Sequence, residues 1–157
     1  MTHRAPRLLA ALAVSGLLVA GCADEGAPIV EDTDERVEAI VHMSPTCDCC
    51  GAHAAHLDAA GYDVTLVEVE DVREIKEKVG LPGGLESCHT TLIDGYAVEG
   101  HVPAASIDRL LTARPAIDGI ALAGMPAGSP GMGGTQQEPW HIESFVDGHV
   151  GPRFDTR

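Results

Sequence analysis

The sequence has 157 residues and carries 24 acidic against 10 basic side chains, a formal net charge of −14 at pH 7. Phosphate binding depends on clustered lysine and arginine, so this charge excludes nucleic-acid binding through a basic surface. The length is that of a single domain. Since the chain has only one Trp, two Tyr and two Phe, its core must be built from aliphatic side chains and alanine.

Residues 1–21 have the features of a secretion signal. Arg4 and Arg7 precede an apolar run over residues 8–20, and the sequence VAG stands directly before Cys22. The run is too short to span a bilayer, and its small terminal residues suit cleavage by a signal peptidase. The VAGC sequence resembles the lipobox of bacterial lipoproteins, whose cysteine is acylated. We therefore expect an exported, membrane-anchored lipoprotein that faces the periplasm, held by acyl chains on Cys22.

Two further segments have no helical or strand pattern. Residues 22–36 are rich in Asp and Glu without apolar periodicity, which predicts an acidic tether. Residues 119–134 contain six glycines with Pro126 and Pro130, a composition that predicts a long loop rather than a helix or a central strand. A single domain over residues 37–150 is expected to contain this loop.

The predicted elements alternate between strand and helix. Apolar runs indicate buried strands, 3.6-residue spacing indicates helices, and the Asp94-Gly95 pair indicates a hairpin turn. An Asp71/Glu74 capping box is expected to begin the second helix, and Pro103 the third. The order is strand 37–43, helix 49–60, strand 64–69, helix 71–80, hairpin 90–98, helix 103–114 and a last strand at 140–146 followed by a turn. A βαβ unit followed by a hairpin and a closing helix predicts an α/β, thioredoxin-like fold with a C-terminal loop and strand extension.

Three cysteines fall where the first predicted strand meets the first helix. Cys47, Cys49 and Cys50 would gather at a helix N-terminus, where free N–H groups and the helix dipole favour thiolates. Cys47 and Cys50 have the C-x-x-C spacing of a thiol–disulfide exchange pair. Cys88 precedes the strand of the hairpin, at a position that in thioredoxin-like folds faces this helix N-terminus and usually holds a cis-proline. Four sulfurs are therefore expected to converge.

Three chemistries can use four converging sulfurs. Two structural disulfides are disfavoured, because adjacent Cys49 and Cys50 suit disulfide geometry poorly. A copper–thiolate site, a catalytic redox pair at Cys47 and Cys50 in a thiol–disulfide oxidoreductase, and a zinc site stay open. Adjacent ligands would strain a single tetrahedral zinc ion. Whether the protein is an enzyme is not decided by these residues.

Other soft donors in the sequence favour copper. His89 adjoins Cys88, His101 follows the hairpin, and Met125 and Met132 lie in the glycine-rich loop. Thiolate and thioether together select Cu(I), and imidazole binds both oxidation states of copper. We expect these four residues to be peripheral or alternative ligands around the cysteines.

Four segments together resemble the CopG-like periplasmic copper-resistance proteins. They are CDCC at residues 47–50, LESCHT at 85–90, GYAVEGHVP at 95–103 and GMPAGSPGM at 124–132. The resemblance extends over about residues 37–147. It implies a thioredoxin-like fold whose clustered cysteines bind copper, as a multinuclear Cu(I)–thiolate cluster, with a part in copper redox handling. Periplasmic copper donor and acceptor proteins are the partners that such a role requires.

The sequence also departs from that family. Asp48 stands where the family usually has glycine, which adds negative charge beside the thiolates, and Ala52 and His53 stand where a tryptophan commonly lies nearby. His53 and His56 share the helix side of Cys49. We expect these two histidines to support the ligands or face solvent rather than to bind metal.

Overall fold

The structure is a computed structural model that describes residues 36–157. The expected signal peptide over residues 1–21, the lipidated Cys22 and all but the last residue of the expected tether lie outside the described residues. Arg36 opens the described part and binds the domain, because its guanidinium donates to the Asp58 side chain at 2.8 Å and to the Gly61 carbonyl at 3.1 Å.

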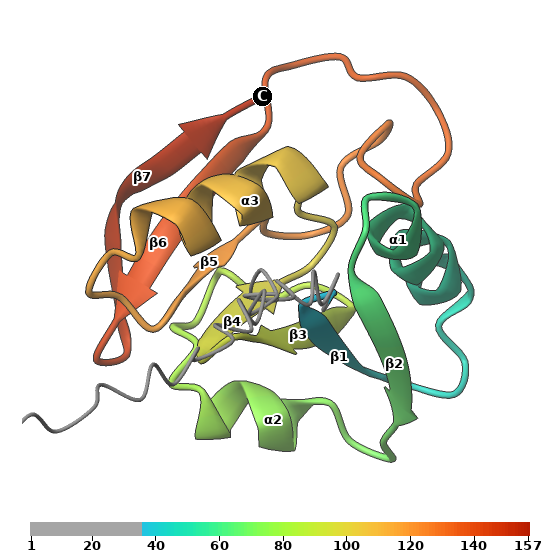
Figure 1. Cartoon of the computed structure of the whole chain (residues 1–157), viewed down its shortest axis with the longest axis horizontal. Coiled ribbons are helices and arrows are strands. Elements are labelled where there is room, and N and C mark those ends of the chain that lie inside the picture. Colours follow the sequence, from blue (N-terminus) through green and yellow to red (C-terminus); the bar gives the residue numbers. More distant parts are fainter. Residues whose placement is uncertain (1–35) are drawn as a thin grey trace, which may run out of the picture. The chain divides into compact units, whose positions relative to one another are not determined.

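The architecture is mixed α/β, built on one seven-stranded sheet in the order β2-β1-β3-β4-β5-β6-β7 (Figure 1). The strands are β1 (Glu38–Met43), β2 (Asp63–Glu68), β3 (His89–Ile93), β4 (Tyr96–Glu99), β5 (Gly119–Ala121), β6 (His141–Val146) and β7 (His149–Thr156). The β1–β2 and β4–β5 pairs are parallel, and the other neighbouring pairs are antiparallel. The predicted βαβ unit and the predicted hairpin are both present.

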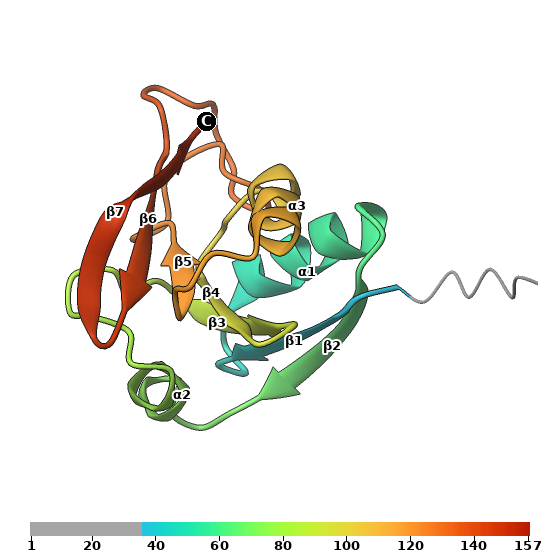
Figure 2. The same cartoon turned by 60° about the vertical axis from the view of Figure 1, so that its left-hand side comes forward.

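Three helices cover the two faces of the sheet. Helices α1 (Asp48–Ala59) and α3 (Ala104–Ala113) lie on one face, and the short α2 (Arg73–Lys78) lies on the other, as Figures 1 and 2 both show. No helix among residues 36–157 is long and apolar enough to cross a membrane.

Each face of the sheet has its own hydrophobic core. Alternate residues of β1 are buried, as the period-2 pattern of a strand requires. Below α1 and α3 the packed side chains include Val41, Leu57, Val98 and Ile107, none of which has exposed surface. The opposite face has a smaller cluster around Phe145 and Leu85. The domain is therefore stabilised mainly on the face that also carries the N-terminus of α1.

The expected buried strand at residues 64–69 is instead an edge strand. Residues of β2 are half-buried or exposed throughout, and Leu66 is 48 % exposed. The valine- and leucine-rich run predicted burial on both faces, but β2 is the first strand of the sheet and pairs only with β1. Apolar composition identified the strand without fixing its place in the sheet.

The expected long loop over residues 119–134 is wrong at its start, where β5 lies in the middle of the sheet. All three residues of Gly119–Ala121 are buried between β4 and β6. Gly119 suits this central strand because a Cβ there would collide with the Ala97 carbonyl and lie 2.6 Å from the Phe145 ring. The remaining residues, 122–140, contain no helix or strand.

The C-terminal strand predicted at residues 140–146 is confirmed as β6. The Asp147-Gly148 turn follows it with positive φ at both residues, and β7 then pairs antiparallel with β6. The sheet continues to Thr156, six residues beyond the expected domain end at 150.

Candidate metal centre

Four sulfur atoms meet where α1 begins. Cys47 is the N-cap residue of α1, Cys49 and Cys50 lie in its first turn, and Cys88 directly precedes β3. The four sulfurs all lie within 4.8 Å of one another. The orphan N–H groups at this helix end favour negatively charged sulfur. The structure thus brings together the four cysteines that the sequence singled out.

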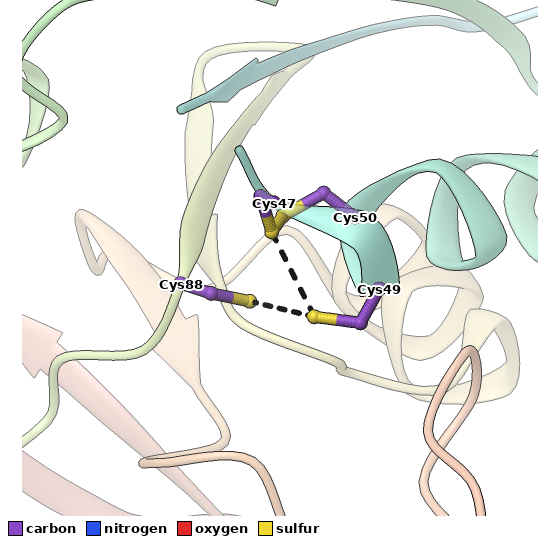
Figure 3. A group of neighbouring side chains, drawn as sticks. All are labelled: Cys47, Cys49, Cys50 and Cys88. Atoms are coloured by element: carbon purple, nitrogen blue, oxygen red, sulfur yellow. Dashed lines mark hydrogen bonds between the residues drawn. A yellow bond between two sulfur atoms is a disulfide. The ribbon is translucent and has the colours of Figure 1, made fainter. Parts of the chain in front are cut away.

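Two of these sulfurs are bonded to each other and two are free. Cys47 and Cys50 form a disulfide, while Cys49 lies 3.7 Å from the Cys47 sulfur and 3.8 Å from that of Cys88 (Figure 3). Cys50 is fully buried, whereas Cys47 is partly exposed. Of the two disulfide residues, Cys47 is therefore the one that a thiol from solvent can approach more easily.

Two buried histidines approach the free thiol of Cys88. His89 Nδ1 lies 3.2 Å from the Cys88 sulfur and His101 Nε2 lies 3.0 Å from it. Neither imidazole has exposed surface. Burial, together with the neighbouring Cys49, raises the pKa of the Cys88 thiol to about 11. In the metal-free protein Cys88 is thus a thiol beside two ring nitrogens.

His53 extends this group into the interior. It lies on the buried side of α1, and its Nδ1 is 2.9 Å from His89 Nε2 while its Nε2 is 3.0 Å from the Val102 carbonyl. Burial lowers the pKa of His53 to about 4, and burial with the neighbouring His53 and His101 also lowers the pKa of His89. Both rings are therefore neutral near pH 7. The expected supporting role of His53 corresponds to this contact with His89.

The glycine-rich loop packs directly against the start of α1. Pro130 accepts a hydrogen bond from His101 Nδ1 at 2.7 Å. A Cβ on Gly131 would lie only 2.6 Å from the His53 backbone nitrogen, and its φ of +83° favours glycine. The loop therefore approaches the histidines through its backbone.

The two methionines of this loop differ in exposure. Met125 is 53 % exposed, and Met132 is half-buried in a turn in which its N–H donates to the Ser129 carbonyl at 2.8 Å. Among the described residues, the groups of cysteine, histidine and acidic side chains close enough to share a metal ion are the four cysteines and the set Cys88, His89 and His101. Of the other histidines, His56 accepts a hydrogen bond from the Ala104 N–H at 3.2 Å.

A buried ion pair lies behind Cys88, and sequence reasoning missed it. Glu99 has no exposed surface, pairs with Lys76 and accepts hydrogen bonds from Thr90 Oγ1 and the Ser87 N–H, each at 2.6 Å. A charged residue in the hairpin and another in an amphipathic helix gave no signal of this contact. The alternation that buries Glu99 on the α2 face was the one available hint.

Comparison with known proteins agrees with this arrangement. A family model described as "Protein of unknown function, DUF411" matches residues 85–132, which contain Cys88, His89, His101 and the glycine-rich loop. No curated protein matches the chain.

Two solved structures are similar to the domain over nearly their whole length. "Copper resistance protein copG- Form 2" is 37 % identical with a TM-score of 0.72, and the match covers 78 % of this chain and 99 % of that one. "Copper resistance protein copG- Form 1" is 38 % identical with a TM-score of 0.71, covering 78 % and 98 %. The resemblance noted in the sequence is thereby confirmed, and the chain belongs to the CopG-like copper-resistance family.

Proposed function

We propose that this protein binds Cu(I) on the thiolates of Cys47, Cys49, Cys50 and Cys88 and so contributes to copper resistance. The convergence of four sulfurs at one helix N-terminus carries the proposal. Soft thiolates select Cu(I) over harder cations, and the copper-resistance role of the relatives indicates the same metal. Four sulfurs so close together can bridge several ions, which supports a multinuclear site.

Copper loading of all four sulfurs requires prior reduction. The Cys47–Cys50 disulfide takes up two electrons and two protons from a dithiol, which is itself oxidised to a disulfide. Each thiol then releases its proton when Cu(I) binds. Thiol redox chemistry and copper binding would therefore be coupled. Reoxidation of Cys47 and Cys50 to the disulfide would release two electrons, which two Cu(II) ions could accept to become two Cu(I), and would withdraw two thiolate ligands from bound copper.

Imidazole and thioether groups would complete the site. His89 and His101 already contact the Cys88 sulfur, which supports them as peripheral ligands. Met125, with its side chain exposed, and Met132 would serve as soft donors at the entrance, in the loop that packs over α1.

The cellular setting belongs to the same proposal. The signal-like residues 1–21 and Cys22 support export and lipid anchoring in the periplasm, with copper passed from and to other periplasmic proteins. We infer a thioredoxin-like fold, supported by the parallel β1–α1–β2 unit, the antiparallel β3–β4 pair and the place of Cys88 before β3.

Anaerobic Cu(I) titration of the reduced protein tests this function. We expect more than one Cu(I) per chain, and a lower stoichiometry in a Cys88→Ser variant, with His141→Asn as the exposed control. Unchanged stoichiometry and affinity in Cys88→Ser would remove Cys88 from the site. Elemental analysis of protein purified without added metal would identify zinc if zinc is the resident ion.

A second function is favoured by the disulfide itself. Cys47 and Cys50 would act as the catalytic pair of a thiol–disulfide oxidoreductase, with the partly exposed Cys47 attacked first. Copper-independent reduction of insulin that persists in a Cys49→Ser, Cys88→Ser double variant would favour this enzyme over a copper-binding protein.

A further inference from the structure

The two outer strands of the sheet differ in how they are protected. β2 lies at one edge and β7 at the other (Figure 1). An edge strand presents backbone groups that can pair with another chain, and proteins usually protect it with proline, a charged side chain or an irregular register. β7 contains Pro152 and Arg153, and its register with β6 shifts twice. β2 contains no Pro, Gly, Lys or Arg, and its register with β1 is continuous.

The backbone groups of β2 that face outward follow from alternation along the strand. The N–H groups of Asp63 and Val69 both donate to carbonyls on the β1 side, at 2.9 Å. The backbone groups of Val64, Leu66 and Glu68 therefore point away from β1. Within residues 36–157 no strand pairs with this side of β2, and the Leu66 side chain is exposed as well.

The charge along this edge has one sign. Asp63, Glu68 and Glu70 are exposed, and none of them forms an ion pair in the part of the chain that the structure describes. Residues 37–72 contain no Lys or Arg. Complementary potentials favour association and like charges oppose it, so the edge suits a cationic strand and repels an anionic one.

A pocket beside the end of β2 continues the acidic surface. It has a volume of about 440 Å³ and lies between β2 and α2, and its charged lining residues are Glu70, Asp71, Glu74 and Lys78. Since Asp71 pairs with Arg73, the carboxylates of Glu70 and Glu74 remain against one ammonium.

His42 also lines this pocket. Its Nδ1 is buried and has no hydrogen-bond partner among the described residues. A buried polar atom without a partner is unfavourable. In the neutral ring with its hydrogen on Nε2, Nδ1 can accept a hydrogen bond from an ammonium or guanidinium group. The pocket therefore offers both carboxylates and an acceptor to a basic side chain.

We infer that the β2 edge binds an extended segment of a partner protein that carries lysine or arginine. The segment adds to the sheet beside β2 and pairs with the outward backbone groups. Leu66 pairs with Val41 on the α1 face and Val67 with His42 on the α2 face. Alternate side chains of the segment therefore lie beside Leu66 and at the acidic pocket. Main-chain hydrogen bonds supply affinity in this mode, and the alternate side chains supply specificity.

Charge disfavours two other occupants of the edge. If two copies paired their β2 strands antiparallel over the full length, Asp63 of each copy would lie opposite Glu68 of the other. Like charges directly opposite each other destabilise a strand pair. Residues 22–35 of the chain itself contain Asp and Glu but no Lys or Arg, and meet the same repulsion.

Hydrogen exchange of the metal-free protein tests the inference. The probe is a peptide of about eight residues that alternates lysine with valine. At about ten times its dissociation constant, we expect exchange at the amides of Val64, Leu66 and Glu68 to slow about tenfold, with the β7 amides unchanged. Peptide binding without slower exchange at these three amides would mean ionic attraction only and would overturn the inference.

Two control peptides separate the charge from the backbone pairing. One has glutamate in place of every lysine, and the other keeps lysine but has every backbone nitrogen methylated. We expect neither to bind. Equal binding of the glutamate peptide would contradict the basic partner, and equal binding of the methylated peptide would contradict strand addition. Slower exchange at the same amides with rising protein concentration, without peptide, would identify a second copy as the occupant and overturn the inference.

Variants of the edge and the pocket locate the binding. Leu66→Pro removes an outward N–H, leaves the bonds to β1 and should abolish peptide binding, whereas Leu66→Thr keeps that N–H and should bind. Glu70→Gln should weaken binding about two- to fivefold, and the exposed Glu138→Gln should not. Wild-type affinity in both Leu66→Pro and Glu70→Gln would contradict the proposed surface. Because no metal is present, this result is independent of the copper titration.

Discussion

Glu99 and Lys76 form a buried ion pair beside the segment that carries Cys88. Glu99 also holds the backbone of Ser87, the residue before Cys88, through an N–H···O bond of 2.6 Å. The carboxylate therefore connects α2 to the segment that sets the position of Cys88. The ion pair lies on the α2 face of the sheet, whereas His89, the neighbour of Cys88, contacts His53 of α1 on the other face.

Removing the charge of Glu99 should destabilise the domain strongly. In Glu99→Gln the Lys76 ammonium stays buried without its partner, which typically costs about 3–5 kcal/mol. Urea denaturation of the metal-free protein measures this loss. A Lys76→Met, Glu99→Gln double variant should recover part of it, because no unpaired charge is then buried. If Glu99→Gln lowers the free energy of unfolding by less than about 1 kcal/mol, the ion pair is solvated.

The glycine-rich loop should depend on Gly131 but not on Gly133. A Cβ at Gly131 meets the backbone of Ala52 and His53 and the residue has positive φ, whereas a Cβ at Gly133 meets nothing within 4 Å. We expect Gly131→Ala to lift the loop from α1, lower the unfolding free energy by about 1–3 kcal/mol, and speed alkylation of Cys88. Gly133→Ala is the matched control. Equal alkylation rates in the two variants would mean that the loop does not cover the thiol.

The metal-free protein should lose stability as the pH falls from about 6.5 toward 4. The pKa of His53 is about 4 in the folded state and near 6.5 when unfolded, so the unfolded chain binds more protons within this window and stability rises with pH. The single group contributes up to about 3 kcal/mol, lost progressively below pH 6.5. Burial lowers the pKa of His89 in the same direction.

Urea unfolding at pH 7 and pH 5 measures this dependence. A His53→Gln variant keeps a donor for the Val102 carbonyl and should show a shallower fall in stability between the two pH values. The exposed His149→Gln should behave as wild type. If His53→Gln retains the full pH dependence, protonation of His53 is not its cause.

His53 also offers a test of how the ligands are positioned. Because its Nε2 must donate to the Val102 carbonyl, its Nδ1 is the acceptor that orients His89, and His53→Gln removes that acceptor. Loss of such a supporting contact typically weakens metal binding about 10–100-fold. We expect this loss for Cu(I) in the reduced protein, at unchanged stoichiometry. Wild-type affinity in the variant would show that the tautomer of His89 is fixed by other means.

Local patterns predicted most of the elements, because each depends on neighbouring residues. The hairpin is the clearest case, since Asp94 and Gly95 both adopt the positive φ that such turns require. The burial of β2 and the existence of β5 could not be predicted in this way. Both depend on which strands become neighbours, and the run around Gly119 contains too few residues to show a period.

The candidate site likewise has one part that the sequence predicts and another part that depends on the folded sheet. The cysteine spacing and the place of Cys88 before a strand predicted that the sulfurs converge, since topology alone brings them together. Which ring nitrogens of His53 and His101 donate hydrogen bonds depends on the carbonyls of Val102 and Pro130. These carbonyls are far from the histidines in sequence, so no spacing of residues predicts the contacts. The ion pair of Lys76 with Glu99 likewise joins elements that only the folded sheet brings together.

X-ray absorption of the reduced protein loaded anaerobically with Cu(I), together with the copper count, tests the four-thiolate proposal most directly. Binding by Cys47, Cys49, Cys50 and Cys88 predicts more than one copper per chain, a first shell dominated by sulfur, and copper–copper scattering from bridging thiolates. A single copper with a first shell of nitrogen and oxygen would contradict it.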